Sequence, residues 1–257
     1  MKKLIILTML LLFFGCVEET ETVDADRDGW MADNEDIIVS QNASAILITA
    51  PDCFSCDYGD YILFTVQTQE LGTTIVDVTR LEHNSTQAKL LISHYEIEKL
   101  PTLILKKNTD WDHRTLSWWE SQIGTFEGDS SLVMRDVYPP YYDLETGEFR
   151  GFVEFKLLVD NSCTECYDAN QLADNLITSL RLIAEKEEVD IQSEEGMELI
   201  ERYNITKVPT FIVNDEIREY PGFDEFWLST GNPMGEDGWI VFRTVEDVGA
   251  YYITLDE

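Results

Sequence analysis

Apolar residues along the chain gather into short runs that alternate with segments of helical periodicity. Runs at residues 45–49 and 153–159 predict buried strands. Each run leads through a Cys-x-x-Cys sequence into a helix-like segment, 58–66 in one case and 169–187 in the other. The pattern therefore predicts the same strand-to-helix unit twice.

The elements that follow also come in pairs. A β-branched stretch at 73–78 or 189–191 predicts the next strand, and a helix then ends near Tyr95 or Tyr203. A further strand follows a proline, and the segments 131–137 and 239–245 predict an added edge strand. Strands that alternate with helices predict an α/β fold, in which each half has a partly parallel, mixed sheet flanked by helices.

The two halves of the sequence are copies of each other. The residues YEIEKLPT at 95–102 recur as YNITKVPT at 203–210, an offset of 108, and Trp119 and Trp227 keep that offset. The boundary between the copies is predicted near the turn-like Glu145-Thr146-Gly147. We therefore expect a first copy at 37–146 and a second copy at 147–257.

The N-terminus predicts export. Lys2 and Lys3 precede an apolar run at 4–14, which is too short to span a bilayer and is typical of a signal peptide, assigned to residues 1–15. The run ends at Gly15-Cys16 and resembles a lipoprotein signal, which implies a lipid on Cys16. An uncleaved anchor and a plain signal peptide are the alternatives. Each alternative predicts an extracytoplasmic protein, and lipidation would hold it at the membrane facing outward.

Charge excludes one class of partner. Fifty acidic residues against eighteen basic ones give a net charge of −32, which repels phosphate backbones, so no nucleic acid is expected to bind. The simplest interpretation of this charge is a solvated acidic surface.

An acidic segment at 16–36 precedes the first copy. It matches the calcium-loop pattern D-x-[DN]-x-[DN]-G-x5-E and resembles EF-hand loops. The predicted ligands are Asp24, Asp26, Asp28, the backbone carbonyl of Trp30, and Glu35. The alternative is an acidic tether that binds no metal.

Besides Cys16, the chain contains two close cysteine pairs, Cys53/Cys56 and Cys163/Cys166. Such pairs close very short loops, so their value lies in reactivity or metal binding more than in cross-linking. A pair at the opening turn of a helix places its first sulfur over unpaired amides, which favour the thiolate. An X-Pro-Thr turn that contains a cis proline leaves the preceding backbone free to pair with an extended substrate.

Together, strand, Cys-x-x-Cys helix, strand, helix and X-Pro-Thr strand resemble the thioredoxin fold. Their duplication resembles the two-unit protein disulfide oxidoreductase and disulfide isomerase-like families, over residues 37–257. The resemblance implies that Cys53 and Cys163 attack, that Cys56 and Cys166 resolve, and that exported protein thiols and disulfides are the partners. It also implies that Pro101 and Pro209 are cis and bind substrate with Leu100 and Val208. No cofactor is expected to be required, calcium is a possible ligand of the preceding loop, and the electron donor is not identified.

Acidic residues surround both pairs: Asp52, Asp57 and Asp60 near the first, and Glu165 and Asp168 near the second. Negative charge raises a thiol pKa, so the reduced form is less stabilised and the disulfide is a weak oxidant. This favours reductase or isomerase work. The alternatives are inert disulfides in a redox-silent client-binding or scaffold module, a four-cysteine zinc site, and copper binding.

Overall fold

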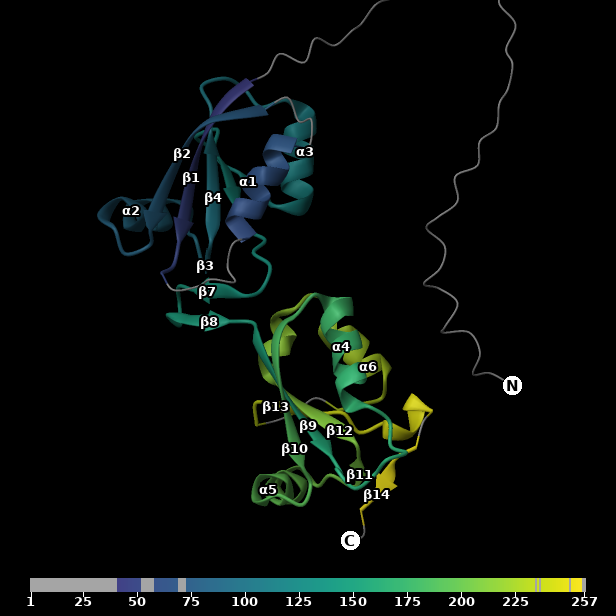
Figure 1. The fold of residues 1–257 in the computed structure, drawn as a ribbon. Coiled ribbons are helices and arrows are strands. Elements are labelled where there is room, and N and C mark those ends of the chain that lie inside the picture. The colour runs from purple at the N-terminus through teal and green to yellow at the C-terminus, as the bar shows by residue number, and fades with distance from the viewer. Residues whose placement is uncertain are drawn as a thin grey trace, which may run out of the picture. The chain divides into compact units, whose positions relative to one another are not determined.

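A computed structural model describes residues 41–51, 58–68, 73–233, 235, 237–249 and 251–255 (Figure 1). These residues belong to one compact unit, Val39–Glu257. Several predicted features lie outside the described residues: the signal peptide, Cys16, the calcium loop and the pair Cys53/Cys56.

The first copy is built on a five-stranded sheet of order β2-β1-β4-β6-β5. The strands are β1 (Gln41–Thr49), β2 (Thr73–Glu82), β4 (Thr102–Lys106), β5 (Gly124–Phe126) and β6 (Leu132–Met134). β1 is parallel to β2 and antiparallel to β4, and the remaining pairs are antiparallel. The sheet is therefore mixed, as predicted.

Helices cover both faces of this sheet. They are α1 (Tyr58–Thr68), α2 (Thr86–Tyr95) and α3 (His113–Gln122), with α1 and α3 on one side and α2 on the other (Figure 1). Alternation along β4 explains the two cores, since Leu103 and Leu105 pack with α1 and α3 while Ile104 packs with α2. β4 thus contributes side chains to the hydrophobic cores on both faces of the sheet.

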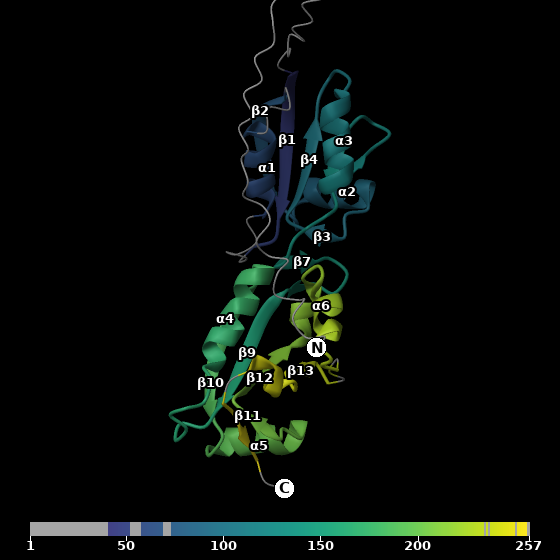
Figure 2. The ribbon, with the colours of Figure 1, turned by 90° about the vertical axis from the view of Figure 1, so that its right-hand side faces the viewer.

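The second copy repeats this plan with a four-stranded sheet of order β10-β9-β12-β13. The strands are β9 (Phe152–Val159), β10 (Ile183–Asp190), β12 (Thr210–Asn214) and β13 (Trp239–Val241). β9 is parallel to β10 and antiparallel to β12. The helices are α4 (Ala169–Leu180), α5 (Glu194–Tyr203) and α6 (Phe223–Ser229), with short 3-10 helices η1 (Asp215–Glu219) and η2 (Val245–Val248). α4 and α6 share one core and α5 packs in another (Figure 2).

The protein is therefore an α/β protein with two tandem thioredoxin-like units, and this prediction is confirmed by strand order and direction. The duplication extends to individual contacts. Arg135 donates to the carbonyl of Tyr95 at the end of α2 (2.6 Å), and Arg243 donates to that of Tyr203 at the end of α5 (2.8 Å). Trp119 and Trp227 are both buried.

Two small sheets lie beside the prolines. β3 (Lys99–Leu100) pairs with β7 (Tyr141–Asp143), which pairs with β8 (Glu148–Arg150). β11 (Lys207–Val208) pairs with β14 (Ile253–Thr254). The predicted boundary near Glu145–Gly147 falls in the turn of the β7–β8 hairpin, where the Asp143 carboxylate accepts from two turn amides (2.8 and 3.0 Å).

Two predictions about elements are wrong. The helix predicted at 169–187 ends at Leu180, because Arg181 takes a left-handed conformation (φ 52°) that caps it, and the chain then enters β10. Charged residues of high helix propensity fill β10, but pairing with β9 overrides that propensity. The segment 131–137 is also not an edge, since β5 pairs beyond β6.

Candidate functional site

The second cysteine pair lies in the loop between β9 and α4. A turn from Asp160 presents it: the Cys163 amide donates to the Asp160 carbonyl (2.9 Å), and the Asp160 carboxylate accepts from the Ser162 amide (2.8 Å). Cys163 and Cys166 form a disulfide with their Cα atoms 5.6 Å apart. Both residues are half-buried, and the two residues between them are exposed. The sulfurs are therefore near the surface.

The pair does not lie in the opening turn of the helix, so that expectation is wrong for the second copy. α4 begins at Ala169, and its N-cap is Asp168, whose carboxylate accepts from the Asn170 amide (2.8 Å). An aspartate is a strong N-cap, whereas the residues before it are held in turns. A carboxylate therefore occupies the position beside the helix amides that we had expected a sulfur to occupy.

Tyr167 connects the cysteine loop to the proline loop. It follows Cys166 directly, and its hydroxyl donates to the carbonyl of Pro209. Burial raises the pKa of this phenol, so it stays a neutral donor. Sequence reasoning missed Tyr167, and the only signal was an aromatic residue directly after the second cysteine. The first copy has Asp57 at the corresponding place, 110 positions earlier.

Both prolines expected to be cis are cis: the Leu100–Pro101 and Val208–Pro209 bonds have this geometry, as does Pro139–Pro140. In the first copy the proline lies against α1. A Cβ placed on Gly59 would lie 3.3 Å from the Cβ of Pro101 and 2.3 Å from the side chain of Leu47. The start of the helix that follows Cys56 in sequence is thus in contact with the proline loop.

Strands of this same chain pair with the backbone that precedes each cis proline. In the second copy Val208 pairs with Ile253 and Lys207 with Thr254, and the Leu255 amide donates to the Thr206 carbonyl (2.9 Å). Figure 1 shows β14 in yellow beside β11. The positions assigned to an extended substrate are therefore already paired in this structure.

The first copy has the same arrangement with β7. Leu100 pairs with Tyr142 and Lys99 with Asp143, and the Leu144 amide donates to the Glu98 carbonyl (2.9 Å). The side chains of Leu100 and Val208 are fully buried, so only their backbone could meet a client. A role for these residues in substrate binding stays a prediction.

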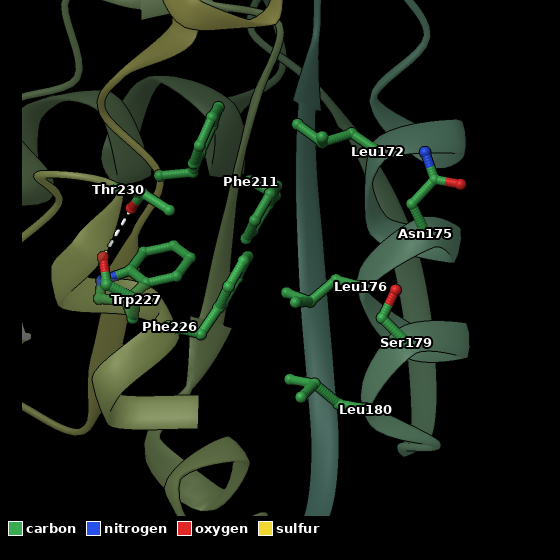
Figure 3. Close-up of a pocket in the computed structure, with 10 residues that line it drawn as sticks. Leu172, Asn175, Leu176, Ser179, Leu180, Phe211, Phe226, Trp227 and Thr230 are labelled. Carbon is green, nitrogen blue, oxygen red and sulfur yellow. Dashed lines mark hydrogen bonds between the residues drawn. The ribbon is translucent and has the colours of Figure 1, made fainter. Parts of the chain in front are cut away.

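An apolar pocket of about 190 Å³ lies between α4 and α6. In Figure 3, Leu172, Leu176 and Leu180 of α4 point toward the rings of Phe211 and Phe226. Because α4 directly follows the cysteine loop, the pocket lies within the same copy as the disulfide but on the core side of the helix.

Neither metal nor membrane sites can be assigned to the described ranges. Within them, no three His, Cys, Asp or Glu side chains are grouped to hold a metal ion. No helix of the described part of the chain is long and apolar enough to cross a membrane. The predicted calcium loop and lipid site lie at residues that the structure does not describe.

No family model and no curated protein sequence matches this chain. Among solved structures it is similar to the alkylhydroperoxide reductase component AhpF of Enterococcus faecalis, at 12% identity and a TM-score of 0.21, covering 68% of this chain and 83% of that one. Human ERp44 has 12% identity and a TM-score of 0.20, with 86% and 98% covered. ERdj5 has 8% identity and a TM-score of 0.20, with 73% and 25% covered. These TM-scores are low, so the fold assignment depends on strand order and direction.

Proposed function

We propose that this protein is a thiol–disulfide oxidoreductase that reduces or rearranges disulfides of exported proteins. One observation carries the proposal: a half-buried disulfide, Cys163–Cys166, whose loop is hydrogen-bonded through Tyr167 to a cis-proline loop. A bond that closes so short a loop adds little stability, which favours a reactive role over a structural one.

The proposed reaction starts from the reduced pair. The Cys163 thiolate attacks one sulfur of a client disulfide, a mixed disulfide forms, and the other client sulfur leaves as a thiolate. The Cys166 thiolate then attacks the Cys163 sulfur, which releases the second client thiolate, and both client thiolates take protons from water. Two electrons have passed to the client, and the pair is left as the disulfide seen here. An external dithiol returns two electrons and two protons to restore the pair.

The negative charges near the Cys163–Cys166 pair bear on whether the pair donates or reduces disulfides. The amides at the start of α4 are partnered by Asp168, and Glu165 adds an exposed carboxylate between the cysteines. Neither group stabilises a neighbouring thiolate, and a poorly stabilised thiolate gives a stable disulfide with a low reduction potential. This supports reduction or isomerisation over disulfide donation.

The remaining parts of the proposal concern residues that the structure does not describe. We propose that Cys53 and Cys56 form an equivalent pair, and that lipid on Cys16 holds the protein at the outer side of a membrane. We further propose that Asp24, Asp26, Asp28, Trp30 and Glu35 bind calcium. Sequence alone supports these assignments.

The test is insulin reduction driven by a dithiol, using Cys53→Ser and Cys163→Ser singly and together. Each single variant should lose the activity of its own pair, and the double variant should fall to the rate of the dithiol alone. Thr164→Ser is the matched control, because Thr164 is exposed between the cysteines and the change keeps its hydroxyl. Activity that survives in the double variant contradicts the proposal.

A second candidate is a redox-silent module that binds clients or scaffolds an assembly. The occupied strand edges beside both prolines favour it, because they leave no free backbone there for a reacting peptide. This candidate predicts that the wild-type protein gives no insulin reduction above the dithiol alone.

A further inference from the structure

The strand beside the second proline has features of a bound peptide. Residues 251–255, here called the strap, run from the cysteine loop to the proline loop. At one end the Tyr167 amide donates to the Tyr251 carbonyl (3.0 Å), and Tyr167 is next to Cys166. At the other end β14 pairs antiparallel with Lys207 and Val208. An extended client that reached both the sulfurs and the cis-proline loop would need the same backbone groups.

We propose that the strap is a built-in competitor: it occupies the peptide-binding edge of the second site and is displaced when an extended client binds. This inference depends on the function proposed above. It assigns a regulation to that site, in which access to the Cys163–Cys166 disulfide is set by the fraction of molecules whose strap is open.

The strap is weakly held. Its sheet has two strands and a ladder of two residue pairs, which is marginal in water. Tyr251 and Thr254 are exposed, and Ile253 and Leu255 are only partly covered where they pack on the second copy. Few buried apolar contacts and few hydrogen bonds are the conditions under which a segment opens locally.

In the first copy, β7 pairs beside the cis proline as the strap does in the second copy, but β7 is held more firmly. β7 belongs to a three-stranded sheet. Tyr141 is only 3% exposed, its hydroxyl donates to Glu219, and the Lys99 ammonium lies 4.1 Å from the centre of its ring. In the strap the contact that corresponds is longer, since the Lys207 ammonium lies 5.7 Å from the centre of the Tyr252 ring, and Tyr251 is 57% exposed. We therefore infer displacement only at the second site.

The expected change in reaction rate follows from the fraction of molecules whose strap is open. A few backbone hydrogen bonds, offset by the cost of ordering the segment, correspond to an open fraction on the order of one in ten. When only the open state binds, the apparent affinity for an extended peptide is about one tenth of the affinity of the open state. Removing the strap should therefore speed reaction with such a peptide about tenfold. A small dithiol needs no strand pairing, and its rate should not change.

The experiment uses the full chain with Cys53→Ser and Cys56→Ser, so that one disulfide remains to be followed. Reduction of Cys163–Cys166 is timed with dithiothreitol and with a reduced, cysteine-containing peptide of alternating β-branched residues. The comparison is with deletion of residues 251–257 and with Ile253→Asp. Leu228→Asp is the matched control, since it places the same charge on an exposed apolar residue of α6. We expect faster peptide reaction in the deletion and in Ile253→Asp only.

Equal rates of reaction with the peptide in all variants would refute the proposal that the strap competes with clients, while leaving the proposed function intact. Failure of the full chain to turn over in insulin reduction would instead overturn the proposed function. If the deletion variant loses its near-ultraviolet circular dichroism, hydrogen exchange in the full chain decides. Saturating peptide should then speed exchange of the Leu255 amide, and an unchanged exchange rate would refute displacement.

Discussion

Removing the Cys163–Cys166 disulfide should cost the second copy little stability. The two cysteines are three positions apart, and the entropy of closing so small a loop corresponds to about 2 kcal/mol. A loss of that size lowers the melting temperature of a unit of about 110 residues by roughly 9 °C. We therefore expect the double variant Cys163→Ser/Cys166→Ser to remain folded and to melt roughly 9 °C below the wild type.

The assay is thermal unfolding followed by near-ultraviolet circular dichroism, with and without dithiothreitol. The oxidised wild type should melt highest. The reduced wild type and the double variant should melt together, and the reductant should not shift the double variant. A loss above about 4 kcal/mol, or unfolding of the second copy on reduction, would show that the bond is a structural staple. That result would refute the argument that the loop is too short to have a mainly stabilising role.

Two further predictions concern hydrogen bonds that the structure shows. Tyr167→Phe removes the donor to the Pro209 carbonyl and should lower the free energy of unfolding by about 1 to 2 kcal/mol, measured by urea unfolding. The control Tyr251→Phe, at an exposed tyrosine, should cause no measurable loss, and equal losses in the two variants would contradict the bond. Hydrogen bonds from Thr125 and then from Arg135 lower the pKa of Glu127, and a group with a lowered folded pKa adds stability above its unfolded pKa that is lost as the pH falls through the folded one. The urea midpoint of the wild type should therefore fall more steeply than that of Glu127→Gln from about pH 5 downward, and parallel curves would refute this assignment.

The repeat made much of the fold predictable from sequence. The segments around Leu100-Pro101 and Val208-Pro209 match so closely that any element assigned to one copy is supported by the other. The cis geometry followed from the resemblance and the mixed sheets from the alternation of strands and helices, and both are present. Duplication thus compensated for weak local signals in strands such as β2, whose alternation is incomplete.

Other features could not be predicted because non-local contacts determine them. α3 and α6 were not assigned, although the packing of Trp119 and Trp227 holds each against its sheet. β14 becomes a strand only because Lys207 and Val208 offer it a partner. The start of α4 at Ala169 was predicted, but the cysteines were wrongly expected in its opening turn, because Asp168 was counted as a charge near them and not as the cap of the helix.

The acidic strand β10 has a consequence for how copies of this protein meet one another. It forms an edge of the second sheet, and Glu185, Glu187 and Glu188 are exposed along it. An edge strand offers unpaired amides and carbonyls to any other strand, which is a route to fibrils and precipitates. A row of carboxylates repels an identical row, so two molecules cannot join their sheets there without bringing like charges together. The charged residues that give this strand a helix-like sequence therefore also oppose pairing between two copies of the protein at this edge.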